Sequence, residues 1–326
     1  MVDLSVEIGC LKLANPIMPG SGTFAEGMEK VIDLNLVGAF VAKTITPEIR
    51  EGNPQPRVAE IKNGLIGSIG IPSKGPEHFI REIVPFYRRF KPPFVASVSA
   101  NTAEEFGELS AQISVEDVAA IEANISCPNL KRDGEAFGMR SSDTAEVVAA
   151  IKKHTSLPVW AKLTPNVSNI SEIACAAEAA GADALVVANA LLAMAVDTQN
   201  FRPKLGNVMG GITGPSIKPI ILRMAYQCAK SVDIPIIGSG GAATVADVAE
   251  YMLVGCSAVQ VGTASFIHPT AMTDIIGGLT TYLEAQGLNS VTDLIGAMIE
   301  PGDEDVGVKD LPSIRSVGGV DEGAKV

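Results

Sequence analysis

The sequence predicts an α/β protein built as a single (β/α)₈ TIM barrel, and three observations lead to this fold class. Eight short apolar runs recur along the chain, and each is followed by a segment with helical spacing. The runs are nearly continuous in apolar residues, as expected for parallel strands that are buried on both faces. The repeat occupies about 280 residues, close to the roughly 250 that are typical of this barrel.

The expected strands and helices follow in order along the chain. The eight strands are expected at residues 15–19, 39–44, 94–100, 120–127, 158–164, 184–190, 234–238 and 258–262. Four helices with amphipathic spacing are expected at residues 143–154, 168–180, 218–230 and 244–254. The second of these ends at Gly181 and the last at Gly255, and Thr244 with Asp247 has the spacing of a capping box.

A doubly wound α/β sheet is the competing architecture. It would need fewer strands per domain and a linker, and the middle of the chain contains no linker rich in Pro, Gly and Ser. Residues 47–75 fall outside the repeat and are too long for an ordinary barrel loop, so we expect them to cap the catalytic face. Residues 301–326 are glycine-rich and acidic, and we expect them to form a loosely packed tail after a barrel of residues 1–300.

The composition excludes several classes of function. The 326 residues carry a formal charge of −12, whereas nonspecific binding to DNA or RNA needs clustered cations. No apolar run reaches the roughly 18 residues of a membrane-spanning helix, and the first residues lack the pattern of a secretory signal. The five cysteines form no C-x-x-C pair, which argues against an iron–sulfur or zinc ribbon site in this chain. We therefore expect a cytoplasmic protein that binds neither nucleic acid nor membrane.

In a barrel of this kind the active site lies at the carboxyl ends of the strands. None of the three histidines and no Asp/Glu/His cluster falls on these ends, so we expect neither histidine acid–base chemistry nor a metal. The residues at the strand ends carry hydroxyl, amine, amide or thiol groups or are turn-forming glycines: Ser21, Gly22, Thr23, Lys43, Thr44, Ser97, Asn124, Ser126, Cys127, Asn129, Lys162, Asn189, Gly240, Gly241, Gly262 and Thr263.

Two glycine turns follow the seventh and eighth expected strands, in IIGSGGAAT and VQVGTASF. Backbone N–H groups at helix starts bind phosphate, and this fold often uses these two loops for that purpose. The alternative is that Gly240 and Gly241 only make a tight turn, but the pairing of two such turns favours phosphate binding. Residues 20–25 also match the G-x-G-x-x-A dinucleotide pattern. No acidic residue follows at the end of a second strand, so we reject nicotinamide binding by this chain.

Three residues with reactive side chains lie at the ends of expected strands, next to apolar residues. Lys43 and Lys162 would be desolvated in the barrel mouth and need an anionic partner to stay charged. That partner is either Glu122, the one acid near these strand ends, or a bound anion, which we favour. Cys127 is either a small buried hydrophobe or a base that removes a substrate proton next to an electron sink. Its position between a strand and the glycine-containing segment LKRDGEAFG favours the base.

These motifs, in this order, resemble the dihydroorotate dehydrogenase family. The matching segments run from about residue 4 to residue 287 and read NPIMPGSGTF, EGNPQPRVAE, NISCPN, AFG, KLTPNV, GGITGPSIKPIILRM, IPIIGSGG and AVQVGTASF. The chain resembles in particular the NAD-linked, class 1 type of catalytic subunit, which carries FMN in a (β/α)₈ barrel.

The resemblance implies roles for the matching residues. The catalytic residues are Cys127, which takes the C5 proton of dihydroorotate while a hydride passes from C6 to flavin N5, and Lys43, which touches flavin and substrate. Lys162 lies against the flavin pyrimidine edge, where a cation stabilises the anionic reduced flavin. The FMN-binding residues are Ser21, Gly22, Lys43, Thr44, Ser97, Asn124, Lys162, Gly214, Gly240, Gly241, Gly262 and Thr263, the last four at the phosphate. The substrate-binding residues are Lys43, Gly67, Ile69, Gly70, Ile71, Asn124, Asn129, Asn189 and Ala190.

At three of these positions the sequence departs from the family pattern. Gly67 stands where the family has an asparagine in the substrate loop, and Ala190 where it has a threonine or serine after the sixth strand. Ser97 replaces an asparagine near the flavin.

The resemblance implies FMN-dependent oxidation of dihydroorotate to orotate in de novo pyrimidine biosynthesis. It also implies a homodimer that passes electrons to a separate subunit carrying FAD and an iron–sulfur cluster. The alternative is a related FMN barrel that acts on another small cyclic or carboxylated substrate. A noncatalytic flavin or phosphate binder is disfavoured because Lys43, Cys127 and Lys162 occur together.

Overall fold

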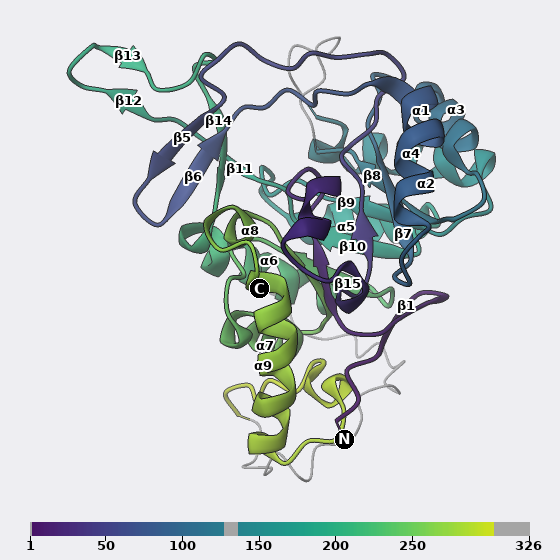
Figure 1. The fold of residues 1–326 in the computed structure, drawn as a ribbon, viewed down its shortest axis with the longest axis vertical. Coiled ribbons are helices and arrows are strands. Elements are labelled where there is room, and N and C mark those ends of the chain that lie inside the picture. Colours follow the sequence, from purple (N-terminus) through teal and green to yellow (C-terminus); the bar gives the residue numbers. More distant parts are fainter. Residues whose placement is uncertain (1, 127–135, 303–326) are drawn as a thin grey trace.

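The computed structural model describes residues 2–126 and 136–302. Its centre is a parallel eight-stranded sheet (Figure 1), and each strand falls within or overlaps one of the eight predicted runs. The strands are β3 (Ile17–Pro19), β4 (Phe40–Val41), β7 (Phe94–Val98), β8 (Val118–Asn124), β9 (Val159–Lys162), β10 (Ala184–Val187), β15 (Ile236–Ser239) and β16 (Cys256–Val261). The predicted fold class, a single (β/α)₈ barrel, is confirmed.

The sheet closes into a barrel where its two outermost strands, β3 and β4, approach each other. The strand order is β3-β16-β15-β10-β9-β8-β7-β4, so the first and second strands of the barrel stand at its two edges. Just before β4, the backbone N–H of Gly38 donates to the carbonyl oxygen of Ile17 at 2.7 Å. A Cβ at position 38 would overlap the Asn15 carbonyl oxygen, so this close approach of two backbones requires glycine.

The four predicted helices are all present. They are α4 (Ser141–His154), α5 (Ile170–Ala179), α6 (Lys218–Ala229) and α7 (Val245–Leu253), and α3 (Ala103–Ile113) and α9 (Ala271–Gln286) complete the long helices of the described chain. The capping box at the start of α7 forms as expected between Thr244 and Asp247. The expectation of a helix after every strand is wrong for the first link, where two 3₁₀ turns (Glu26–Lys30 and Leu34–Leu36) connect β3 to β4.

The remaining helical segments are short. Helices α1 (Gly75–His78) and α2 (Val84–Tyr87) flank a π-helical turn before β7, and α8 (Thr263–Ile267) follows β16 directly. At the amino ends of the barrel strands, the hairpin of β1 (Val6–Ile8) and β2 (Leu11–Leu13) buries apolar side chains before the chain enters β3. Within the part of the chain that the structure describes, no helix is long and apolar enough to cross a membrane.

A second sheet lies beyond the carboxyl ends of the barrel strands. Its antiparallel order is β11-β14-β6-β5, and the strands are β11 (Leu191–Ala193), β14 (Gly210–Thr213), β6 (Gly64–Gly67) and β5 (Val58–Ile61). Residues 47–75 supply β5 and β6, as expected of a segment that caps the catalytic face. The link after β10 supplies the other two strands, together with a hairpin of β12 (Val196–Asp197) and β13 (Arg202–Pro203) that projects at the upper left of Figure 1. The sequence analysis did not predict the four strands of this sheet or the two strands of the hairpin.

Candidate active site

A pocket of about 540 Å³ of unfilled space, including its open mouth, lies at the carboxyl ends of the barrel strands. Nine of its lining residues belong to the predicted site: Ser21, Lys162, Asn189, Ala190, Gly214, Gly240, Gly241, Gly262 and Thr263. Thr23 from the strand-end set and seven further residues complete the lining: Gly20, Ala188, Ile212, Thr213, Ile217, Ser239 and Gln260. The lining contains one lysine and no carboxylate, so its charge suits an anionic ligand in an otherwise acidic protein.

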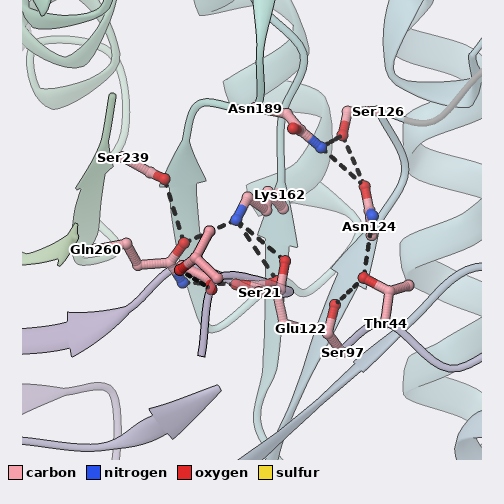
Figure 2. Close-up of polar contacts among 12 residues, drawn as sticks. Ser21, Thr44, Ser97, Glu122, Asn124, Ser126, Lys162, Asn189, Ser239 and Gln260 are labelled. Carbon is pink, nitrogen blue, oxygen red and sulfur yellow. Dashed lines mark hydrogen bonds and ion pairs between the residues drawn. The ribbon is translucent and has the colours of Figure 1, made fainter. Parts of the chain in front are cut away.

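Lys162 is the cationic centre of this pocket. It ends β9 and is 4% exposed, and its Nζ donates to Gln260 Oε1 at 2.8 Å and to Ser21 Oγ at 3.4 Å (Figure 2). Ser239 Oγ also donates to the same oxygen of Gln260, at 3.2 Å. These contacts bring side chains of β9, β15 and β16 and of the turn after β3 together near one ammonium group.

The alternative partner for the lysines, a buried acid, is present beside Lys162. The expected desolvation of Lys43 is wrong, because its side chain is exposed. Glu122 on β8 is inaccessible to solvent, and its Oε1 lies 3.7 Å from Lys162 Nζ. Burial lowers the pKa of Lys162, and the neighbouring Glu122 carboxylate opposes this shift. The preference for a bound anion alone was therefore incomplete, because part of the compensation comes from the protein. Glu122 does not line the pocket itself.

A chain of amide and hydroxyl groups runs along the neighbouring strand ends (Figure 2). Ser97 Oγ and Thr44 Oγ1 share a hydrogen bond of 3.0 Å, and Asn124 Nδ2 donates to Thr44 Oγ1 at 3.3 Å. Asn124 Oδ1 accepts hydrogen bonds from Ser126 Oγ at 2.7 Å and from Asn189 Nδ2 at 3.2 Å. The structure thus joins residues predicted from four separate strand ends into one hydrogen-bonded row.

Lys43 lies against the turn that follows β3. A Cβ built on Gly22 would sit 3.0 Å from Lys43 Nζ and 3.2 Å from its Cδ, so the lysine side chain crosses the bare Cα of this glycine. Gly22 has a φ of +79°, a left-handed conformation that favours glycine. The predicted pair Gly22 and Lys43 is therefore brought together beside Ser21, although neither residue lines the pocket.

The glycine turn after β15 packs closely against Gly214, which follows β14. Gly241 has a φ of +73°, and a Cβ there would meet the Gly214 carbonyl oxygen at 2.7 Å. Tyr251 Oη donates to the Gly240 carbonyl oxygen at 2.6 Å, which fixes the turn after β15. The close contact at Gly241 therefore favours glycine on steric grounds. Gly240 and Gly241 also line the pocket, as do Gly262 and Thr263.

The predicted substrate loop is not brought into this pocket. Gly67 ends β6, and Ile69, Gly70 and Ile71 follow it, but none of the four is among the pocket residues. Gly70 and Ile71 have left-handed backbones, with φ of +79° and +46°. The loop is nonetheless continuous with the pocket wall through the second sheet, because Gly67 pairs with Gly211, and the next residues, Ile212 and Thr213, line the pocket.

Two predicted residues, the base Cys127 and the substrate ligand Asn129, lie outside the described residues. The expected tail from residue 303 onward lies outside them as well. Among the residues that are described, no group of three or more His, Cys, Asp and Glu side chains could hold a metal ion.

The fold and the site together define a class of protein: a (β/α)₈ barrel with a pocket at the carboxyl ends of its strands that contains a buried lysine and no carboxylate. Comparison with protein families narrows this class, because the family described as dihydroorotate dehydrogenase matches residues 3–283. The chain belongs to the dihydroorotate dehydrogenase family and is an oxidoreductase, and enzymes of this family depend on flavin.

Curated relatives agree over nearly their whole length. A protein of Desulforamulus reducens is 46% identical over 299 residues, which are 91% of this chain and 98% of the relative. Proteins of Geotalea uraniireducens and Trichlorobacter lovleyi are each 45% identical, over 91% and 90% of this chain and 98% of each relative. All three are named dihydroorotate dehydrogenase B (NAD(+)), catalytic subunit.

Proposed function

We propose that this chain catalyses the FMN-dependent oxidation of dihydroorotate to orotate, a step of de novo pyrimidine biosynthesis. One observation carries the proposal: an acid-free pocket with a buried lysine and two glycine turns lies at the carboxyl ends of the barrel strands, in a chain of a flavin-dependent family. The family name and the names of the relatives support the substrate.

The pocket residues fit FMN by their chemistry. Glycine backbone at Gly240, Gly241 and Gly262, together with the Thr263 hydroxyl, offers neutral donors for a phosphate. Ser21, Gly214 and Lys162 would hold the ring system. The hydrogen-bonded Thr44, Ser97 and Asn124 and the packed pair of Gly22 and Lys43 would complete the FMN-binding set. When bound, FMN supplies the electron acceptor for the oxidation.

The chain's own residues would bind the substrate and move its proton. Asn124 and Asn189 offer both donors and acceptors to a cyclic imide and its carboxylate, and Lys43 supplies a cation at the mouth. Asn129 completes this set in the proposal, with the loop of Gly67, Ile69, Gly70 and Ile71 and with Ala190 around the substrate. Cys127 would take the proton from the substrate carbon at C5, which leaves the rest of the pocket to orient the ring.

The names of the relatives also support a division of labour. They are catalytic subunits of an NAD(+)-linked enzyme, and we propose that this chain likewise passes electrons to a separate subunit that carries FAD and an iron–sulfur cluster. We further propose a homodimer of this chain and a cytoplasmic location. If the isolated chain reduced NAD efficiently, the separate subunit would be unnecessary and this part of the proposal would fail.

A steady-state assay tests the activity. The purified, FMN-loaded protein should form orotate from dihydroorotate when an artificial electron acceptor is present. The substitutions Gly67 and Ala190 relative to the family pattern support one second candidate, a related FMN barrel that oxidises another small cyclic or carboxylated substrate. Bound FMN without any orotate production would favour that candidate over ours.

A further inference from the structure

A carboxylate, an amide and an ammonium group meet inside the barrel, beneath the pocket. Glu122 on β8, Lys162 on β9 and Gln260 on β16 are 0%, 4% and 1% exposed. In the strand order β16 is separated from β9 by two strands, so the three side chains meet across the barrel interior (Figure 2). Removing a carboxylate and an ammonium from water is expensive unless each is paired and hydrogen-bonded.

The hydrogen bonds fix how these three groups face one another. Gln260 Nε2 donates to Glu122 Oε2 at 2.6 Å, and Gln260 Oε1 accepts from Lys162 Nζ at 2.8 Å. The amide therefore cannot flip without placing its N–H₂ against the ammonium. The second carboxylate oxygen, Glu122 Oε1, has no hydrogen-bond partner among the described residues and lies 3.7 Å from Lys162 Nζ. Glu122 thus acts on Lys162 both through space and through the oriented amide.

The charge balance at Lys162 depends on this carboxylate. Burial lowers the pKa of Lys162, and the Glu122 charge is the influence that raises it. The other side chains of the described residues that reach Nζ are Ser21, in the turn after β3, and Gln260, on β16, and both are neutral. Without the Glu122 charge, burial would act on the ammonium with no opposing charge among these groups.

We propose that Glu122 is a positioning residue: its carboxylate, tied to Gln260, holds Lys162 as an ammonium ion with Nζ at the pocket wall. The pocket lining includes Lys162 and Gln260 but not Glu122, so the carboxylate supports the cation from below without meeting the ligand. This inference rests on the proposed function for the identity of the anionic ligand, which is the flavin. It does not depend on the identity of the substrate.

The test replaces Glu122 by Gln, which keeps the shape and an acceptor for Gln260 and removes only the charge. Nitrogen-15 NMR of lysine side chains in the FMN-loaded protein reports whether each amine is protonated, and Lys162→Met identifies the Lys162 signal. In the parent, Lys162 should be an ammonium ion at neutral pH. In Glu122→Gln it should lose its proton at a lower pH than it does in the parent.

A second readout separates positioning from a merely structural role. In Glu122→Gln, the flavin midpoint potential plotted against pH should gain a break at the pH where Lys162 loses its proton, and Glu122→Asp, which keeps the charge, should lack it. The matched control is Glu29→Gln, which removes the carboxylate of an exposed pair with Arg89 at 3.0 Å and should change neither readout.

Three results would overturn the inference. A neutral Lys162 amine in the parent would do so without any variant, even if Glu122→Gln failed to fold. An unchanged Lys162 titration in Glu122→Gln would show that the charge is not needed. A break in Glu122→Asp like that in Glu122→Gln would assign the effect to side-chain shape. Dihydroorotate appears in none of these measurements, so their outcome is independent of the proposed substrate.

Discussion

Placing an asparagine at Gly67 should tighten the binding of orotate if orotate is the product. Gly67 ends β6 without a left-handed backbone, and a Cβ built there meets nothing nearer than Ile69 Cδ1 at 3.9 Å. A Cβ therefore fits at this position without displacing a neighbour. Position 190 offers no such room, because a Cβ on Gly211 would overlap the Ala190 Cβ, so the two backbones already pack closely. Gly67→Asn is thus the clean variant, and Ala190→Thr should be crowded.

The expected size of the gain follows from one added hydrogen bond. A neutral hydrogen bond contributes about 0.5–1.5 kcal/mol, and 1.4 kcal/mol corresponds to a tenfold change in affinity. Gly67→Asn should therefore lower the orotate dissociation constant by about 2- to 12-fold. Orotate can be titrated into the FMN-loaded protein while the change in flavin absorbance is followed. Gly67→Ala is the matched control, since it adds the Cβ without the amide and should leave the dissociation constant unchanged.

Comparing the orotate dissociation constants of these two variants shows whether an amide at position 67 reaches the ligand. Equal dissociation constants for Gly67→Asn and Gly67→Ala would show that no amide at position 67 reaches the ligand. If the parent and both variants also failed to bind orotate, the proposed substrate would be wrong and the FMN barrel would need another one.

Three further predictions address catalysis, barrel closure and acid stability. Cys127→Ala should keep FMN bound but slow flavin reduction by dihydroorotate by about 10²- to 10⁴-fold in stopped-flow measurements, the usual effect of a positioned base, and near-parental reduction would remove Cys127 from the mechanism. Gly38→Ala should lower the free energy of unfolding by about 1–3 kcal/mol in urea titrations, because its Cβ overlaps Asn15, whereas Gly27→Ala, with nothing within 4 Å, should not; equal losses would refute the steric account. Burial raises the pKa of Asp247, but Lys218 and hydrogen bonds from Ala243 and Thr244 hold it below its ordinary value. Its stabilising contribution should therefore be complete above the unfolded pKa of about 3.9 and be lost as the pH falls through the lower folded value, so the acid limb of unfolding should flatten in Asp247→Asn. An identical acid limb in parent and variant would contradict this.

The barrel could be predicted because strands that are buried on both faces appear in the sequence as continuous apolar runs. The second sheet could not, because its strands are short and glycine-containing, as Gly64 and Gly67 in β6 and Gly210 in β14 show. Its central pairing also joins residues such as Ile66 and Ile212, which are far apart in the chain, and a single sequence carries no signal for that pairing.

The strand-end rule gathered eight of the 17 pocket residues, since the ends of parallel strands meet on one face of the barrel. It missed Gln260 and the orientation of Glu122, which lie inside strands and not at their ends. A signal was present: a glutamine between two valines in an otherwise apolar strand is costly to bury unless it has partners. In β8, Glu122 also stands two residues before Asn124, and the strand period of two places both side chains on the same face.

Anaerobic mixing of the FMN-loaded protein with dihydroorotate tests the central claim most directly. Loss of the oxidised flavin absorbance, with about one orotate formed for each flavin reduced, is the result that the account predicts. Flavin that stays oxidised in the presence of excess dihydroorotate, in a protein that a chemical reductant still bleaches, would contradict it.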